Sequence, residues 1–249
     1  MWPLAMSHLV NSKLSPSTAA WKTRCVAEFL ADGDRVVEST QARRTYPGTR
    51  RIPLDPGRGS WGPDFSRVLA SRRSARSFSR RAIEPRTLAR LLVGAAGVTG
   101  EMPVPGAAGI VQRLRAWPSA GALYPIELYP VLLDGPACHF DPLEPCLEVL
   151  DEGPMRERVA PHVLSYAGEL DAPLLLVLTG VPGRVLTKYG ERGYRFLWLD
   201  AGHLAQNLVL AATALGLAAC PIGGFHDDEL ACALPIDRRE SVLYLIAIG

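Results

Sequence analysis

The amino-acid sequence predicts an α+β fold in which one mixed sheet is flanked by helices. Helix-like and strand-like segments interleave along the 249 residues without the regular βαβ alternation of a doubly wound sheet. Between residues 126 and 151, short strand-like segments follow one another directly, which is typical of a meander. The apolar segment 196–217 is long enough to form a buried helix.

The N-terminal part differs from the rest of the chain in its pattern. Residues 1–59 show little hydrophobic periodicity and end in YPGTRRIPLDPGRG, which is dense in proline, glycine and arginine. We therefore expect an irregular or partly helical arm over 1–59, followed by one domain over 60–249.

Within the domain, each element has its own signal. DFSRVLASRR predicts a short helix, and IEPRTLARLLVGAAG predicts a longer one, because Glu84 and Pro85 fit a first helical turn. Residues 99–116 predict a loop or hairpin. IELYPVLL predicts a strand, followed by two short edge segments around Cys138 and Leu147. The remaining elements are an amphipathic helix PMRERVAPHVLSYA, a buried strand APLLLVLTG, the helix 196–217, a strand AACP, a helix DDELACAL and a strand SVLYLIAIG.

The composition excludes several classes of protein. Hydrophobic residues make up 48% of the chain and charged residues 21%, unlike a disordered or fibrous protein. The formal net charge of +2 gives no global field that would favour nucleic acid. The five cysteines include no C-x-x-C pair and the five histidines no zinc-ligand spacing, so we expect no metal site. An odd number of cysteines without a secretion signal indicates a cytoplasmic protein.

The segment 196–217 is the part of the chain that most resembles a membrane span. It carries Asp200, His203, Gln206 and Asn207 at spacings of three and four, which places a polar stripe along one helix face. A lipid-facing helix would not carry such a stripe. We therefore predict no membrane span, and a buried helix whose polar face serves a function or an interface.

SRRSARSF, residues 71–78, concentrates hydrogen-bond donors. Arginine forks and a serine hydroxyl suit a phosphate group, and the alternative is a solvated basic end of a helix. The donors are Arg72, Arg73, Ser74 and Arg76.

Two other motifs contain small residues that would let a ligand approach the backbone. In WPSAGALYP, Ser119, Ala120 and Gly121 stand between bulky neighbours, which suits a flat ring, a phosphate or simply a tight turn. In CPIGGF, Gly223 and Gly224 leave backbone N–H groups uncovered, which suits a ligand or an ordinary strand-to-helix turn.

TKYGERGYR, residues 187–195, places Lys188 beside Tyr189 directly before the long helix. Burial next to an aromatic ring, together with like charge from Arg192 and Arg195, would lower the pKa of the lysine toward the range of a general base. Tyr189 would then orient a substrate or share the proton transfer. The alternative is a solvated loop whose charged side chains cap the neighbouring elements.

In their order along the chain, these motifs resemble the nitroreductase superfamily. Within it they are similar to the SagB-type dehydrogenases, which oxidise azolines in thiazole- and oxazole-modified peptides. The resemblance rests on SRRSARSF, PSAGALYP, KYGERGYR, LDAGHLAQNL, ALGLAACPIGGF and a final apolar strand, and it covers about residues 60–249. It implies a nitroreductase-like homodimer that binds FMN at the subunit interface.

The resemblance also implies roles for individual residues. Arg72 and Ser74 would grip the flavin phosphate and ribityl chain, and Arg76 would lie near the pyrimidine edge, where a cation stabilises reduced flavin. The turn that reaches the flavin of the other subunit would consist of Pro118, Ser119, Ala120 and Gly121. The backbone near flavin N5 would come from Pro221, Ile222, Gly223 and Gly224.

Two positions depart from the family pattern. Simple nitroreductases have an acidic residue where this chain has Gly223. Many relatives continue beyond the last strand into a basic residue that also holds the phosphate, whereas this sequence stops at Gly249. Either Arg73 supplies that contact, or flavin binds more weakly.

The resemblance implies an FMN-dependent dehydrogenase that converts peptide thiazolines or oxazolines to thiazoles or oxazoles. Lys188, with Tyr189 beside it, would remove a proton from the ring carbon next to the carbonyl, and a hydride would pass to flavin N5. Dioxygen would then reoxidise the flavin. The peptide would be attached to a leader segment or a carrier protein, with a cyclodehydratase or synthetase complex as a partner. Two alternatives stay open: an NAD(P)H-dependent nitro- or quinone reductase, and a non-catalytic flavin-containing scaffold subunit.

Overall fold

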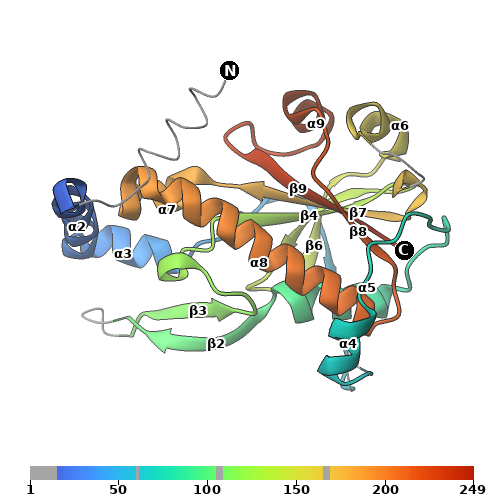
Figure 1. The fold of residues 1–249 in the computed structure, drawn as a ribbon, viewed down its shortest axis with the longest axis horizontal. Coiled ribbons are helices and arrows are strands. Elements are labelled where there is room, and N and C mark those ends of the chain that lie inside the picture. The colour runs from blue at the N-terminus through green and yellow to red at the C-terminus, as the bar shows by residue number, and fades with distance from the viewer. Residues whose placement is uncertain (1–15, 60–61, 105–108, 165–168) are drawn as a thin grey trace.

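The computed structural model describes residues 16–59, 62–104, 109–164 and 169–249 (Figure 1). The helices are α2 (Pro16–Ala31), α3 (Gly33–Thr40), α4 (Phe65–Ser71), α5 (Pro85–Ala96), α6 (Arg156–Val159), α7 (Pro182–Tyr189), α8 (Gly193–Ala214) and α9 (Asp227–Ala233). Short 3-10 turns are η1 (Ala120–Ala122), η2 (Ala160–His162), η3 (Glu169–Asp171) and η4 (Gly190–Arg192). The strands are β1 (Arg50–Pro53), β2 (Val98–Pro103), β3 (Val111–Arg115), β4 (Ile126–Leu132), β5 (Ala137–Asp141), β6 (Cys146–Asp151), β7 (Leu174–Gly180), β8 (Ala219–Ile222) and β9 (Ser241–Ile248).

Seven strands form one sheet in the order β1-β6-β5-β4-β7-β9-β8, and β2 and β3 form a separate hairpin. The prediction of a mixed sheet is wrong, because all neighbouring strands described in this sheet are antiparallel. The helices α7 and α8 connect β7 to β8, and helical connections of this kind commonly join parallel neighbours. Here β9 lies between the two strands and pairs antiparallel with both, so the crossover produces no parallel pair.

The N-terminal residues contribute to this sheet. β1 pairs with β6, so β5 and β6 are interior strands, and the edge segments expected around Cys138 and Leu147 are a wrong prediction. The residues of β1, RRIP, gave no strand signal because proline is depleted in strands and the two arginines break the apolar alternation. α2 packs against α7 and buries Phe29 in a hydrophobic core. The domain boundary at residue 59 stays a prediction.

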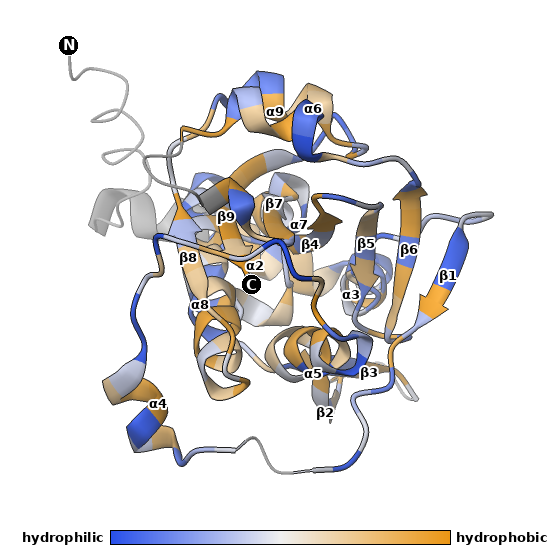
Figure 2. Cartoon of the chain, turned by 90° about the vertical axis from the view of Figure 1, so that its right-hand side faces the viewer, coloured by the Kyte–Doolittle hydropathy of each residue, from blue (hydrophilic) through white to orange (hydrophobic). Residues whose placement is uncertain are grey.

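Each face of the sheet has its own hydrophobic core. α5 and α8 lie on one face, whereas α6 and α9 lie on the other (Figure 2). The first core includes Leu91 of α5 and Leu204 of α8, and the second includes Val159 of α6 and Leu230 of α9, all with no exposed surface. The sheet therefore fixes α8 in place, and α8 carries part of the candidate site described below.

α8 is the long helix expected over 196–217, and it spans Gly193–Ala214. It ends just before Gly216, whose φ of 74° is typical of a residue that terminates a helix. The helix expected over PMRERVAPHVLSYA is shorter than predicted, because Pro161 interrupts the α-helical hydrogen bonds. Its end, residues 165–167, lies outside the described residues. Among the described helices, none combines the length and the apolar character needed to cross a membrane.

A buried charge network crosses three neighbouring strands. The imidazole of His139 on β5 lies 2.9 Å from a carboxylate oxygen of Glu127 on β4 and 2.9 Å from one of Glu148 on β6. Burial alone would lower the pKa of His139, but the hydrogen bonds to the two carboxylates outweigh it and raise this pKa to about 9. His139 is therefore an imidazolium at neutral pH, and Arg184 forms a second ion pair with Glu127.

Candidate functional site

A strained turn lies in WPSAGALYP, where the sequence predicts a ligand approach or a tight turn. Gly121, Ala122 and Tyr124 have positive φ angles of 63°, 54° and 43°. This left-handed region disfavours residues that have a Cβ atom, so contacts around the turn must hold Ala122 and Tyr124 in it. Strain of this kind is found mostly at functional sites.

Side chains within and beside the turn hold this conformation. The backbone N–H of Tyr124 donates to Ser119 Oγ at 2.9 Å, and the backbone N–H of Arg115 donates to the Tyr124 hydroxyl at 2.9 Å. The Arg115 guanidinium lies 4.8 Å from the centre of the Tyr124 ring and 5.4 Å from that of Trp117. The ring of Tyr124 is thereby fixed on two sides.

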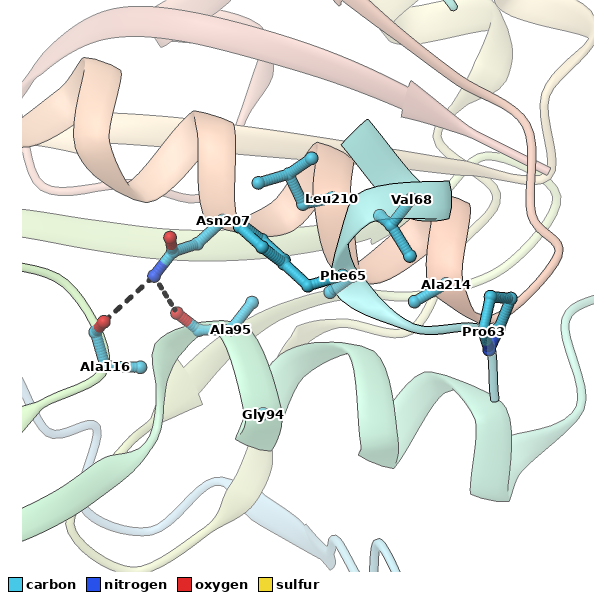
Figure 3. A pocket seen from close by; sticks show the side chains of 10 residues that line it. Pro63, Phe65, Val68, Gly94, Ala95, Ala116, Asn207, Leu210 and Ala214 are labelled. Carbon is cyan, nitrogen blue, oxygen red and sulfur yellow. Dashed lines mark hydrogen bonds between the residues drawn. The ribbon is translucent and has the colours of Figure 1, made fainter. Parts of the chain in front are cut away.

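The polar stripe of α8 faces the segment that leads into this turn. Asn207 Nδ2 donates to the backbone oxygen of Ala116 at 3.0 Å and to that of Ala95 at 3.4 Å (Figure 3). His203 Nδ1 lies 3.2 Å from the backbone oxygen of Pro118. The polar face predicted for this helix is therefore directed at backbone of the same chain.

Asp200 extends the stripe to the turn itself. Its carboxylate accepts hydrogen bonds from the Ser119 hydroxyl and the Ala120 backbone N–H. Burial raises the pKa of Asp200 to about 6, against the opposing effect of these hydrogen bonds and of His203. The sequence places Asp200 on the polar face, but no local signal pairs it with Ser119.

Lys188 and Tyr189 lie at the end of α7 and face the same turn. A Cβ atom placed on Gly121 would stand 2.8 Å from Lys188 Nζ and 2.6 Å from the Tyr189 hydroxyl oxygen. The lack of a side chain at Gly121 thus leaves room for both groups. The pair belongs to a helix and not to a loop, since α7 extends through Tyr189. The structure therefore brings the predicted pair and the predicted turn together.

Burial determines the protonation of this pair. Both side chains are half-buried, and Lys188 Nζ lies 5.1 Å from the centre of the Phe29 ring. Burial lowers the pKa of Lys188, and the like charge expected from Arg192 and Arg195 does not contribute to this lowering. Burial raises the pKa of Tyr189, so its hydroxyl stays protonated at neutral pH.

The arginine segment, SRRSARSF at residues 71–78, lies against β8. Ser74 forms a parallel bridge with Ala219, and the Ala75 N–H donates to the Ala219 carbonyl oxygen at 2.9 Å. Arg76 Nη1 lies 3.1 Å from Cys220 Sγ. The fold therefore places SRRSARSF beside CPIGGF, although the two motifs lie far apart in the sequence.

The donors of this segment are accessible. Ser74 and Arg76 are exposed, and Arg72 is half-buried. The exposed Arg73 donates through Nη1 to the backbone oxygens of Ala70, at 3.0 Å, and Arg72, at 2.8 Å, which holds its guanidinium at the end of α4. Exposed guanidinium and hydroxyl donors of this kind suit a phosphate group.

The glycine turn after β8 leaves space next to these donors. Pro221 and Ile222 end the strand, and Gly223 follows. A Cβ atom on Gly223 would meet no atom within 4 Å, whereas one on Gly224 would lie 3.3 Å from Leu164 Cβ. An open backbone beside a phosphate-compatible donor set fits FMN, whose ring needs close approach to main-chain groups.

The two groups of predicted site residues lie on different parts of α8. The strained turn contacts Asp200 and His203 of α8. β8, in contrast, comes after the C-terminal end of this helix in the chain, and the arginine segment lies beside β8 (Figure 1). Beside Asn207, a cavity of about 400 Å³ opens between α4, α5 and α8 (Figure 3). Apolar side chains, among them Phe65 and Leu210, form most of its wall.

Comparison with known proteins identifies the family of this chain. Residues 69–249 match the Nitroreductase family. MJ1384 of Methanocaldococcus jannaschii, which is named as a nitroreductase, is 32% identical over 188 residues, 73% of this chain and 88% of that protein. The Microcin B17-processing protein McbC of Escherichia coli is 30% identical over 164 residues, 62% of this chain and 57% of McbC.

Solved structures of other proteins share the fold. A nitroreductase from Anabaena variabilis has a TM-score of 0.76 at 24% identity, covering 98% of this chain and 46% of that chain. A chain of the E. coli microcin synthetase McbBCD complex, with truncated pro-MccB17 bound, has a TM-score of 0.59 at 23% identity, covering 95% and 97%. At these identities the likeness establishes the fold alone. The chain spans about half the length of McbC and of the Anabaena protein.

Proposed function

Because this chain belongs to the nitroreductase family, whose members typically bind FMN, we propose that it is an FMN-dependent dehydrogenase of peptide azolines. The observation that carries the proposal is the position of Lys188 and Tyr189 against Gly121. The similarity to McbC, a microcin-processing protein, supports a peptide substrate. The enzyme would convert a thiazoline or oxazoline to the corresponding azole, in a peptide joined to a leader segment or a carrier protein.

In this proposal the cofactor is held by the two motifs that meet at β8. Arg72, Arg73 and Ser74 bind the phosphate and ribityl chain, and Arg76 lies at the pyrimidine edge. The glycine turn offers backbone to the ring through Pro221, Ile222, Gly223 and Gly224. When bound, FMN supplies the acceptor for the hydride that leaves the azoline ring.

Lys188 is the base in this proposal. Its neutral amine accepts the proton from the ring carbon next to the carbonyl, and burial supports this role because it lowers the pKa of Lys188. Tyr189, which stays protonated, donates a hydrogen bond that orients the substrate. The ring thus loses one proton to Lys188 and one hydride to the cofactor, and dioxygen is the terminal electron acceptor.

We also propose a homodimer in which the turn Pro118–Gly121 of one subunit completes the flavin site of the other. The separation of the turn from the arginine segment supports this arrangement. Phe65 of α4 and Trp198 and Leu199 of α8 are 67%, 58% and 55% exposed, and a partner subunit would cover them. Interfaces of such dimers commonly exceed about 2,000 Å². By analogy with McbC, a synthetase or cyclodehydratase complex is a further partner in this proposal.

The second candidate function is an NAD(P)H-dependent nitro- or quinone reductase, which the similarity to MJ1384 favours. Rapid loss of NAD(P)H absorbance in the presence of a quinone, without azoline oxidation, would support it. A flavin-containing scaffold subunit without activity would show neither reaction.

The deciding experiment is mass spectrometry of an azoline-containing peptide incubated with the purified yellow protein. The proposal expects the loss of two hydrogens from the peptide. Lys188→Ala and Lys188→Arg should both keep FMN and lose about 10²-fold or more in rate, because arginine keeps the charge but cannot act as a base. Tyr189→Phe should lose less. Full turnover by Lys188→Arg with normal flavin content would exclude Lys188 as the base.

A further inference from the structure

Asp200 differs from the other residues of the polar stripe. The residue is 2% exposed, and its Oδ2 atom is buried and has no hydrogen-bond partner among the described residues. A buried polar atom without a partner loses its hydration and gains nothing in return, so folded proteins keep few of them. The buried carboxylate of Asp200 therefore costs stability in this position.

The surroundings of Asp200 connect it to the turn and to α7. The other carboxylate oxygen of Asp200 accepts hydrogen bonds from Ser119 and Ala120, which directly precede Gly121. Its charge also contributes to raising the pKa values of Tyr189 and Tyr124. The titratable groups that face it are His203 of the same helix, Tyr124 of the turn, Tyr189 of α7 and, beyond Gly121, Lys188.

We infer that Asp200 is a positioning residue: its carboxylate holds Ala120 so that Gly121 stays against Lys188, and protonation weakens this hold. Hydrogen bonds to a charged acceptor are about twice as strong as those to a neutral one. The residues after Ala120 are strained, so the turn depends on restraints of this kind. The catalytic meaning of the contact rests on the proposed function, but the coupling of Asp200 to Lys188 requires no substrate.

The lysine content of the chain makes this coupling measurable. The sequence contains three lysines, Lys13, Lys22 and Lys188, so isotopically labelled dimethyl groups introduced by reductive methylation give few NMR signals. The Lys188→Arg variant identifies the signal of Lys188 by its loss. We expect this signal, in the purified protein, to show a step in chemical shift near pH 6, where Asp200 changes charge.

Three variants test the origin of this step. Asp200→Asn keeps the size of the side chain and should abolish the step. Ser119→Ala should move it to higher pH, because the Ser119 hydrogen bond lowers the pKa of Asp200. Histidines also change charge in this range, so His203→Gln is the control and should retain the step.

The outcomes separate this inference from the proposed function. A wild-type signal without a step, a step that persists in Asp200→Asn, or a step that disappears in His203→Gln would each overturn the inference. If Asp200→Asn does not fold, the direction of the shift in Ser119→Ala decides. An intact step in a protein that oxidises no azoline would overturn the proposed function and leave the coupling of Asp200 to Lys188 standing.

Discussion

The Tyr189 hydroxyl and the backbone of Gly121 are so close that a methyl group on Gly121 would lie 2.6 Å from the hydroxyl oxygen. The same methyl group would lie 2.8 Å from Lys188 Nζ. Gly121 also has a φ of 63°, which residues with a Cβ atom adopt only at a cost. The meeting point of the turn and α7 therefore requires glycine on two independent grounds.

We expect Gly121→Ala to fold but to displace both side chains, because each can move at its flexible end. Azoline oxidation should fall about tenfold or more, since a displacement of about 1 Å at a reacting group can cost up to 10²-fold. The rate is measured at equal flavin content. Gly202→Ala on α8 is the matched control, because a Cβ atom there would meet no atom within 4 Å. An unchanged rate in Gly121→Ala would mean that the turn does not constrain the pair.

Arg72→Ala should weaken the binding of FMN. A charge-assisted contact to a phosphate contributes about 1.5–3 kcal/mol, so affinity should fall roughly 10- to 100-fold. Equilibrium dialysis against FMN measures the change. Arg113→Ala removes an exposed arginine of β3 that pairs with Glu101, and it should bind FMN like the wild type. Equal losses in both variants would indicate a general effect of charge and not a phosphate contact.

The burial of Asp200 should appear in the pH dependence of stability. Its pKa is about 6 in the folded chain, against an ordinary value of 3.8 for an aspartate, so the folded state binds the proton more tightly than the unfolded state. Its contribution to stability is therefore greatest below pH 3.8 and falls by about 3 kcal/mol as pH rises through 6. Relative to wild type, Asp200→Asn should gain about this amount between acid and neutral pH in urea unfolding. A constant difference between the two proteins would contradict the raised pKa.

His139 should act in the same direction, but at higher pH. Because its pKa is raised from 6.5 to about 9, its stabilising contribution is complete below pH 6.5 and is lost as pH rises through 9. The loss should be on the order of 3 kcal/mol. His139→Gln should be destabilised by about 3–5 kcal/mol at neutral pH, because Glu127 and Glu148 would stay buried without their cation. The exposed His226→Gln is the control, and NMR titration of the His139 ring measures the pKa directly.

Local signals in the sequence were sufficient to predict most of the helices and strands. α5 begins where Glu84 and Pro85 indicated, with the Glu84 side chain accepting from the Arg86 and Thr87 N–H groups. α7 gave no clear signal, because PGRVLTKY is short and contains glycine and β-branched residues. The direction of the sheet could not be predicted either, since it depends on where β9 inserts and not on the residues of any one strand.

The candidate site was predictable in its parts but not in their pairing. Lys188, Tyr189 and Gly121 carried visible chemistry, yet their contact depends on how α7 packs on α8. Asp200 was visible only as one member of a polar stripe, because its partner Ser119 lies far away along the chain. Pairings between distant segments are set by tertiary packing, which a single sequence does not display.

The position of β9 sets an order for the assembly of the protein. β9 is the last of the described strands along the chain, yet it lies inside the sheet and joins β8 to β7. During synthesis, β8 therefore has no strand to pair with until residues 241–248 have left the ribosome, and such long-range pairing is slow. Because β8 leads into the glycine turn and supports the arginine segment through Ala219, the proposed flavin site can form only after translation of β9. Cofactor loading would then depend on the prior synthesis of β9.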